Sequence, residues 1–356
     1  MSGLPESAVR QRLLQGMVIP AHPLALTESG KLCSRSQAAL SRYYAEAGAG
    51  GVAVAVHSTQ FEIRQVGLLE PVLRLAVDAV PDALFKGDRW LRIAGVCGPT
   101  MQALREAELA RSLGYDVALI SPTAFQGQPI EDCLRHCAEL AEVMPVMGFY
   151  LQPAAGGLVL PPSFWRQLCS IPGLVGIKIA PFDRYQTQAV VRAVAESGRS
   201  DEVALYTGND DAIVMDLLSS FPGSEGRRIQ LRGGLLGQWA VGTRAAVELW
   251  RGIEAQRMSG GPLEPQWLAA AADLTDLNSA VFDAAHGFSG CLAGVLEILH
   301  RLELIPGVYG LQQGFGLSPG QKEDIDRVWA AYPQWLDLDF VAARRSAWLE
   351  NDSGAV

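Results

Sequence analysis

The stretch Leu174-Val175-Gly176-Ile177-Lys178-Ile179-Ala180 holds a single charge among apolar residues, and it lies between Pro172-Gly173 and Pro181. A short apolar run bounded by turn residues predicts a strand that is buried on both faces of a parallel sheet. Because burial of an ammonium group is costly, Lys178 should either be paired or have a lowered pKa. A neutral lysine attacks carbonyl carbon, whereas a lysine that reaches solvent or pairs with Asp183 would be structural.

Similar apolar runs recur on both sides of this stretch, each followed by a helix-like segment. The repeat of about 25–35 residues is the size of one βα unit. Eight such units predict a (β/α)8 TIM barrel, and their even spacing argues against a doubly wound sheet with a cap. The expected strands are Met17–Ile19, Gly51–Val56, Arg92–Val96, Asp116–Ile120, Val146–Tyr150, Leu174–Ile179, Val203–Tyr206 and Arg228–Leu236. The expected helices are Gln37–Ala47, Leu69–Val77, Gln102–Leu113, Ile130–Met144, Ser163–Cys169, Tyr185–Glu196, Asp210–Leu218 and Arg244–Arg251.

The βα rhythm ends near residue 250. We therefore predict a barrel with an N-terminal lead-in over residues 1–250 and a helical C-terminal region over residues 251–356. In that region Trp267–Leu277, Cys291–Leu302 and Gln321–Tyr332 are expected to be helices without strands between them. The tail Asn351–Val356 is expected to be disordered.

Charge and composition exclude several classes of partner. The net charge is −9, without a basic patch, which argues against nucleic acid and anionic membranes. No apolar stretch has the length of a membrane span, and residues 1–16 have no apolar signal-peptide core, so we expect a cytoplasmic protein. Cys133, His136 and Cys137 lie close together, but no second ligand pair follows. We expect two small apolar residues on a helix face there and no metal site.

Two groups of polar residues follow expected strands. Tyr150 ends the fifth run, one βα unit before Lys178, so both side chains should project at the same rim of the barrel. A tyrosine hydroxyl within reach of an amine can relay protons, although a single tyrosine there is more often ordinary. The turn His57-Ser58-Thr59-Gln60 follows the second run. It would either hold a carboxylate and pass a proton to Tyr150, or cap the next helix.

Three motifs resemble those of the dihydrodipicolinate synthase / N-acetylneuraminate lyase family. They are Tyr150-Leu151-Gln152-Pro153-Ala154-Ala155-Gly156-Gly157, Gly176-Ile177-Lys178 and Thr207-Gly208-Asn209-Asp210-Asp211. The segments Ile19–Leu24 and Leu317–Lys322 are also similar, so the resemblance spans roughly Gly16 to Trp329. It implies a class I aldolase or dehydratase on a (β/α)8 barrel, working without metal or organic cofactor, and a homo-oligomer (dimer or tetramer).

The resemblance also implies residue roles. Lys178 would form a Schiff base with pyruvate or another 2-oxo acid, and Tyr150 would transfer protons. Ser58 and Thr59 match the two threonines of the family's Gly-Thr-Thr-Gly-Glu turn, so Ser58 would assist the relay and Thr59 would bind the keto-acid carboxylate. The further substrate-binding candidates are His57, Gln60, Gly208 and Gly233.

The departures from the family pattern bear on the substrate. His57, Gln60 and Phe61 replace the two glycines and the glutamate of the threonine turn. Ala155 stands where dihydrodipicolinate synthases carry an arginine, and a methyl group cannot replace a guanidinium fork. The segment Pro122-Thr123-Ala124-Phe125 replaces Pro-Tyr-Tyr.

We therefore predict a Schiff-base lyase acting on pyruvate or a sugar-derived 2-oxo acid, and not a true dihydrodipicolinate synthase. The first alternative is a barrel without turnover that binds or senses keto acids. A metal-dependent lyase is disfavoured, because the sequence has no clustered His, Asp and Glu ligands.

Overall fold

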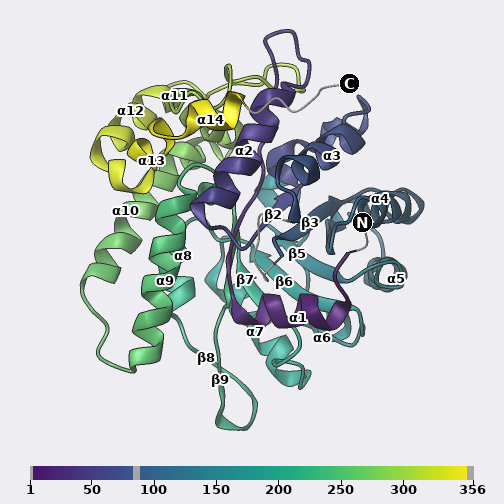
Figure 1. Cartoon of the computed structure of the whole chain (residues 1–356). Helices are drawn as coiled ribbons and strands as arrows, with labels where there is room; N and C mark the ends of the chain where they lie inside the picture. The colour runs from purple at the N-terminus through teal and green to yellow at the C-terminus, as the bar shows by residue number, and fades with distance from the viewer. Residues whose placement is uncertain (1–2, 83–88, 351–356) are drawn as a thin grey trace. The chain divides into compact units, whose positions relative to one another are not determined.

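The backbone contacts of the chain divide it into two compact units. The computed structural model describes residues 3–82 and 89–350 (Figure 1). The first unit comprises the residues up to 17, 91–235 and 253–262, and the second comprises 18–90, 236–252 and the residues from 263 onward. These units do not correspond to the division near residue 250, which stays a prediction.

The first unit contains most of the strands. Its strands are β3 (Leu91–Val96), β4 (Val117–Ile120), β5 (Val146–Leu151), β6 (Leu174–Ala180), β7 (Ala204–Thr207), β8 (Phe221–Pro222), β9 (Arg228–Ile229) and β10 (Gly233–Leu236). Its helices are α1 (Glu6–Gln15), α4 (Thr100–Ser112), α5 (Ile130–Ala141), α6 (Pro162–Leu168), α7 (Arg184–Glu196) and α8 (Ile213–Leu218). The helix α9 (Thr243–Ser259) has residues in both units.

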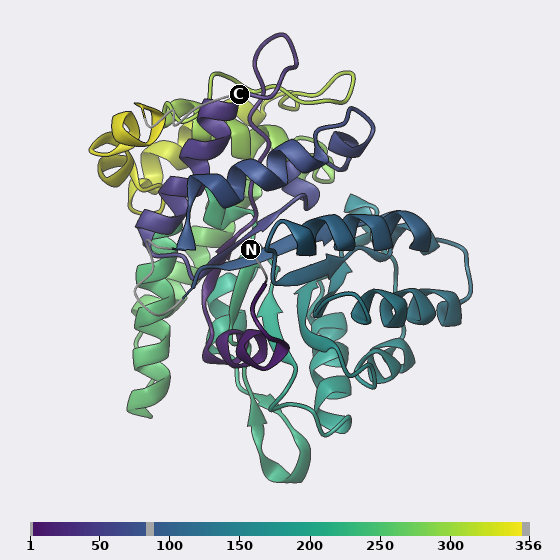
Figure 2. The same cartoon turned by 45° about the vertical axis from the view of Figure 1, so that its right-hand side comes forward.

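Six strands of this unit form a parallel sheet in the order β10-β7-β6-β5-β4-β3. The helices α4, α5, α7 and α8 pack on it, as Figure 2 shows. We call the face toward these helices the outer face and the opposite face the inner face. All residues of β6 are buried, which agrees with its apolar sequence and with a sheet covered on both faces.

The second unit carries two strands and most of the C-terminal helices. Its elements are β1 (Val18–Pro20), α2 (Ser34–Ala47), β2 (Gly51–Val54), α3 (Leu69–Ala79), α10 (Gln266–Val281), α11 (Cys291–Arg301), α12 (Gln321–Ala331), α13 (Leu338–Ala342) and α14 (Arg345–Glu350). A buried carboxylate links three of its segments. Asp337 accepts hydrogen bonds from the Tyr43 hydroxyl (2.6 Å) and from the backbone N–H groups of Arg244 (2.6 Å) and Ala245 (2.9 Å). These bonds hold the start of α9 and the middle of α2 to the residue that precedes α13.

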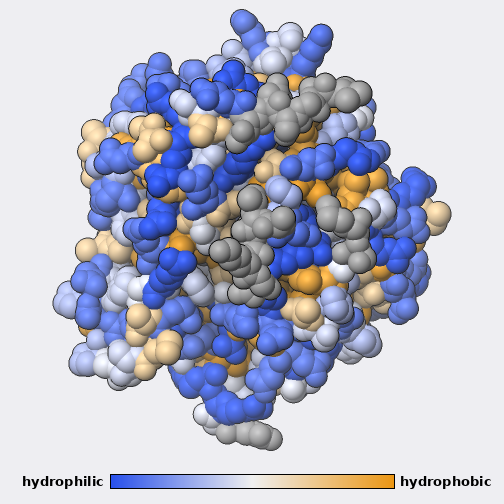
Figure 3. Space-filling view, viewed as in Figure 1, coloured by the Kyte–Doolittle hydropathy of each residue, from blue (hydrophilic) through white to orange (hydrophobic). Residues whose placement is uncertain are grey.

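The predicted fold class is confirmed. The chain has eight parallel strands (β1 to β7 and β10), each followed by a helix, which is the element order of a (β/α)8 TIM barrel. The helices α10 to α14 form the predicted helical C-terminal region. None of the helices in the described ranges is long and apolar enough to cross a membrane. Hydrophilic residues cover most of the face drawn in Figure 3.

The last predicted strand, Arg228–Leu236, is wrong as a single element. Gly226, with φ of 75°, turns the chain so that β9 pairs antiparallel with β8, and only β10 joins the parallel sheet beside β7.

Some helices were not predicted. The helix α1 buries only Val9 and Leu13, which is too little apolar surface to give a helical pattern. The short α13 and α14 bury one residue each, Val341 and Trp348. The predicted disordered tail, residues 351–356, lies outside the described residues.

Candidate active site

Lys178 is a buried amine on the inner face of β6. Only 8% of the residue is exposed, and its Nζ lies 4.3 Å from the centre of the Phe149 ring. Burial lowers the pKa of Lys178 to about 8, and the negative charge of Asp210 opposes this lowering. At pH 7 about a tenth of such an amine is neutral and able to act as a nucleophile. The predicted lowering of the lysine pKa therefore has a physical basis in its surroundings.

Gly208, the residue directly after β7, packs against the Lys178 side chain. A Cβ at this position would lie 2.6 Å from Cε of Lys178 and 2.7 Å from Cβ of Ala180, distances that real Cβ atoms do not show. The Gly208 N–H donates to the Ile179 carbonyl at 2.7 Å, which fixes the glycine beside β6. The structure thus brings Lys178 and Gly208 together, and the glycine leaves room for the lysine stem.

A buried network fixes the turn that carries Gly208. The Asp216 carboxylate accepts hydrogen bonds from Thr207 Oγ1 (2.6 Å) and Asn209 Nδ2 (2.9 Å), and it pairs with Arg184. Asn209 Nδ2 also donates to Thr187 Oγ1 at 3.1 Å. Because the turn continues to residue 212, α8 begins at Ile213 and not at Asp210 as predicted. The network makes this turn a rigid edge of the site.

Tyr150 is not brought to Lys178. The two residues lie on adjacent strands, but Lys178 pairs with Phe149 and Tyr150 pairs with Ile179, so the two side chains point to opposite faces of the sheet. The Tyr150 ring packs on Trp165 of α6, with ring centres 4.8 Å apart. Its hydroxyl donates to Gln186 of α7 and accepts the Leu160 N–H, and burial raises its pKa.

The expectation that both side chains project toward the same space is therefore corrected. The register of β5 and β6 shifts between Val146 and Met147, where β6 has one residue more than β5. A shift of one residue exchanges the two faces of a strand. Phe149 consequently occupies the inner position beside Lys178. The apolar sequence of the strand does not indicate that its two faces are exchanged.

The strand-two turn belongs to the second unit and is described there by itself. Residues His57–Thr59 form a 3-10 turn after β2. The Ser58 hydroxyl donates to the His22 carbonyl at 3.1 Å, and the Thr59 hydroxyl donates to the same oxygen at 2.6 Å. Both hydroxyls thus donate to one backbone acceptor, and their oxygens can still accept hydrogen bonds from other donors.

Gln60 retains the backbone of a glycine. Its φ is 62°, in the left-handed range that glycine favours, where the resembling family has glycine. The side chain is buried, and its Oε1 accepts the Leu311 N–H at 2.7 Å. Next to it, Gln312 Nε2 donates to Glu62 at 2.6 Å, and the His57 ring packs on Phe61. Gln60 therefore links this turn to residues 311–312 of the C-terminal region.

The left-handed backbone of Gln60 is strained for a residue with a side chain, and this strain leads to a prediction. Gln60→Ala should lower the free energy of unfolding by about 1 kcal/mol through the lost hydrogen bond. Gln60→Gly loses the same bond but relieves the left-handed backbone, so it should be roughly 1 kcal/mol more stable than Gln60→Ala. Urea unfolding of the two variants measures this difference. A glycine variant no more stable than the alanine variant would contradict a strained turn.

Gly233, the last predicted binding residue, has a structural reason to be glycine. It pairs with Tyr206, which also pairs with Lys178 on the other side of β7. A Cβ on Gly233 would lie 2.1 Å from the Met17 carbonyl oxygen, so the backbone of Met17 takes the space of a side chain. Its role toward substrate stays a prediction.

The cysteines of α5 face the core. Cys133 and Cys137 are buried on one side of the helix together with His136, whose ring packs on Phe125. Within residues 3–82 and 89–350 no three His, Cys, Asp or Glu side chains group together as metal ligands would.

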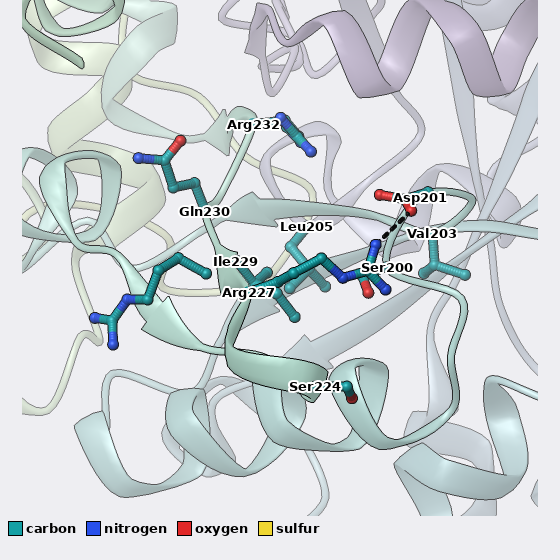
Figure 4. A pocket seen from close by; sticks show the side chains of 10 residues that line it. Ser200, Asp201, Val203, Leu205, Ser224, Arg227, Ile229, Gln230 and Arg232 are labelled. Atoms are coloured by element: carbon teal, nitrogen blue, oxygen red, sulfur yellow. Dashed lines mark hydrogen bonds and ion pairs between the residues drawn. The ribbon is translucent and has the colours of Figure 1, made fainter. Parts of the chain in front are cut away.

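A small hollow of the first unit lies away from Lys178, at the starts of β7 and β10. Its lining includes Ser200, Arg227 and Arg232, and Arg227 pairs with Asp201 at 3.2 Å (Figure 4). Its volume of about 40 Å³ holds a few water molecules at most. Barrel enzymes bind substrates at the carboxyl ends of strands, so this hollow is not the site of a 2-oxo acid.

The fold and the position of Lys178 define a (β/α)8 barrel of the kind that carries its chemistry at the carboxyl ends of strands. The model of the Dihydrodipicolinate synthetase family matches residues 14–226, and the chain belongs to this family.

Two curated relatives are similar over part of the chain. The 4-hydroxy-tetrahydrodipicolinate synthase of Methylococcus capsulatus is 31% identical over 121 residues, which are 33% of this chain and 40% of the relative. The enzyme of the same name from Methanoculleus marisnigri is 28% identical over 120 residues, which are 34% of this chain and 40% of the relative. The matched stretch therefore spans less than half the length of these relatives.

Solved structures support the fold over most of the chain. The chloride-inhibited dihydrodipicolinate synthase from Acinetobacter baumannii, complexed with pyruvate, has a TM-score of 0.71 and 19% identity, covering 88% of this chain and 98% of that chain. CdNal from Clostridium difficile, in complex with mannosamine, has a TM-score of 0.71 and 14% identity, covering 89% and 99%. At these identities the likeness shows the fold alone.

Proposed function

We propose that this protein is a Schiff-base-forming lyase, an aldolase or a dehydratase, that acts on pyruvate or a sugar-derived 2-oxo acid. The observation that carries the proposal is the buried Lys178, whose pKa is lowered to about 8 and whose stem lies against Gly208. Family membership supports the same chemistry.

The chemistry follows from the neutral amine. Lys178 Nζ adds to the C2 carbonyl carbon of the 2-oxo acid, and loss of water leaves an iminium. The iminium accepts an electron pair from C3 when a C3–H or C3–C4 bond breaks, which allows both dehydration and aldol chemistry. The strand-two turn is proposed to hold the keto-acid carboxylate, with Thr59 and Ser58 as the nearest matches to the family's threonines.

We propose a substrate other than that of dihydrodipicolinate synthase. Ala155 supplies no guanidinium for a second carboxylate, and residues Pro122–Phe125 form a 3-10 turn without a tyrosine. Phe125 of this turn is buried against His136. The partner of the 2-oxo acid is therefore expected to be an aldehyde without an anionic end. Assembly into a homo-oligomer is proposed from the resemblance, and light scattering of the purified chain measures it.

A trapping experiment tests the proposal. The protein is incubated with pyruvate, reduced with borohydride and digested, and the peptides are weighed. The chain has only four lysines, Lys31, Lys86, Lys178 and Lys322. We expect the reduced adduct on Lys178, while Lys31 and Lys322, which are exposed, serve as internal controls. No adduct on Lys178 with pyruvate or a panel of 2-oxo acids would refute the proposal.

The pH dependence of trapping gives a separate prediction. Only the neutral amine reacts, so the initial rate of adduct formation should rise with pH and level off above the Lys178 pKa of about 8. Below that pH the rate should fall about tenfold per unit. A midpoint near 10.5, the ordinary lysine value, would mean that burial does not tune this amine.

A keto-acid-binding protein without turnover is the second candidate. The position of Tyr150 favours it, because its hydroxyl is held by Gln186 and Leu160 on the outer face and not beside Lys178. Adduct formation on Lys178 without cleavage or dehydration of any tested substrate would support this second candidate over the first.

A further inference from the structure

The site around Lys178 needs a proton carrier, and the inner face offers few candidates. Phe149 has no titratable group, and Tyr150 points to the outer face. Tyr206 pairs with Lys178 in register, but its hydroxyl donates to the Leu13 carbonyl at 2.8 Å, and burial raises its pKa well above the ordinary tyrosine value. Neither tyrosine is therefore placed to exchange protons with a group bound at Nζ.

Asp210 is a candidate in the turn after β7. It follows Gly208, which touches the Lys178 stem, by two residues in the turn after β7. Between them Asn209 turns its side chain to the outer face, where Thr187 and Asp216 hold it. Asp210 itself is 8% exposed, and it is the charged group whose field acts on Lys178. The rigid turn thus carries a buried aspartate two residues beyond the glycine that touches the Lys178 stem.

We infer that Asp210 is a catalytic residue that carries protons to and from the groups bound at Lys178, in the place where Tyr150 was expected. The inference rests on the proposed function. It assigns proton transfer to the turn after β7, because the inner position of β5 belongs to Phe149 and not to Tyr150.

The proton steps balance. Asp210 takes one proton from the Lys178 ammonium, and the neutral amine adds to the C2 carbonyl. A second proton moves from Nζ to the carbinolamine oxygen. Asp210 then returns its proton to this oxygen, which leaves as water while the nitrogen electron pair forms the C=N bond. The Asp210 carboxylate next takes a proton from C3, and the C–H electron pair forms the C2=C3 bond of the enamine as the C=N electrons return to nitrogen.

The test separates imine formation from proton transfer. Pyruvate is the probe, adduct trapping on Lys178 reports the imine, and NMR in D2O reports exchange of the C3 protons. Asp210→Asn should lower the exchange rate at least about 100-fold, the usual effect of losing a general acid–base group. It should also move the pH midpoint of trapping to lower pH, because a negative charge beside the amine is lost. Asp210→Glu should restore part of the exchange.

Asp211→Asn is the matched control. Asp211 is the next carboxylate of the same turn, and its charge acts on Asp216 and Arg184. Exchange of the C3 protons by the Asp211→Asn variant should stay within about threefold of the wild-type rate. Loss of a catalytic general acid–base group would have a much larger effect. Wild-type exchange in Asp210→Asn would overturn the inference. A loss of exchange in Tyr150→Phe as large as the one expected for Asp210→Asn would also overturn it. In both cases an adduct on Lys178 would still uphold the proposed function. Wild-type protein without adduct would instead refute the proposed function itself.

Discussion

Lys178→Met is expected to abolish adduct formation with 2-oxo acids and, at the same time, to make the protein more stable at pH 7. Methionine fills a similar volume but has no primary amine, so no imine can form and turnover through an imine is lost. The lowering of the pKa from 10.5 to about 8 corresponds to roughly 3 kcal/mol against the charged amine in the fold. Removing this amine should raise the free energy of unfolding by about 1–3 kcal/mol, with the upper end reduced because Asp210 loses its counter-charge.

The pH dependence of stability checks the same argument. The unfolded chain holds the Lys178 proton up to pH 10.5, whereas the folded protein releases it near pH 8. Between these values the unfolded state binds more protons, so the stability of the wild type should rise with pH relative to Lys178→Met. Below pH 8 the difference between the two proteins should be constant. Urea unfolding at pH 7, 8, 9 and 10 measures the difference in free energy of unfolding between the two proteins. If Lys178→Met is less stable than wild type at pH 7, burial of the charged lysine does not destabilise the fold.

The sequence alone predicts that Lys178 lies on a buried strand. The apolar run around Lys178 is buried on both faces in the structure, and its turn residues end β6 where they were expected to. The eightfold repeat predicts the barrel because each unit satisfies its own local pattern. Elements with little apolar surface, such as α1, leave no periodic signal and are found only in the structure.

The orientation of side chains is not predicted in the same way. Tyr150 and Lys178 are separated correctly for adjacent strands, yet the irregularity at Val146 and Met147 turns Tyr150 away. A motif fixes the order of residues along the chain, but it does not fix which face a strand presents after a shift of one residue. Gln60 illustrates the converse, because the unusual backbone persists although glycine has been replaced. The position of a residue along a strand is therefore easier to predict from sequence than the face to which its side chain points.

Gly208→Ala is the second substitution with a large expected effect. The backbone of Gly208 lies outside the left-handed range, so an alanine meets no conformational penalty there. Its Cβ would lie 2.6 Å from Cε of Lys178, and one of the two side chains must move. Because the turn is held by Asn209 and Asp216, the flexible lysine is the part that gives way. We expect the rate of adduct formation to fall at least tenfold and stability to drop by about 1–3 kcal/mol.

Two other glycines separate these effects. Gly148→Ala meets Leu168 at 2.9 Å on the outer face of β5, so it should lower stability by a comparable amount and leave trapping on Lys178 unchanged. Gly316→Ala meets nothing within 4 Å and should change neither property. Trapping rates with pyruvate and urea unfolding curves of the three variants give the comparison. If Gly208→Ala and Gly148→Ala lose trapping equally, the loss reports general destabilisation, and the close contact of Gly208 with Lys178 has no specific part in the chemistry. If only Gly208→Ala loses it, the space that this glycine leaves is what sets the amine in position.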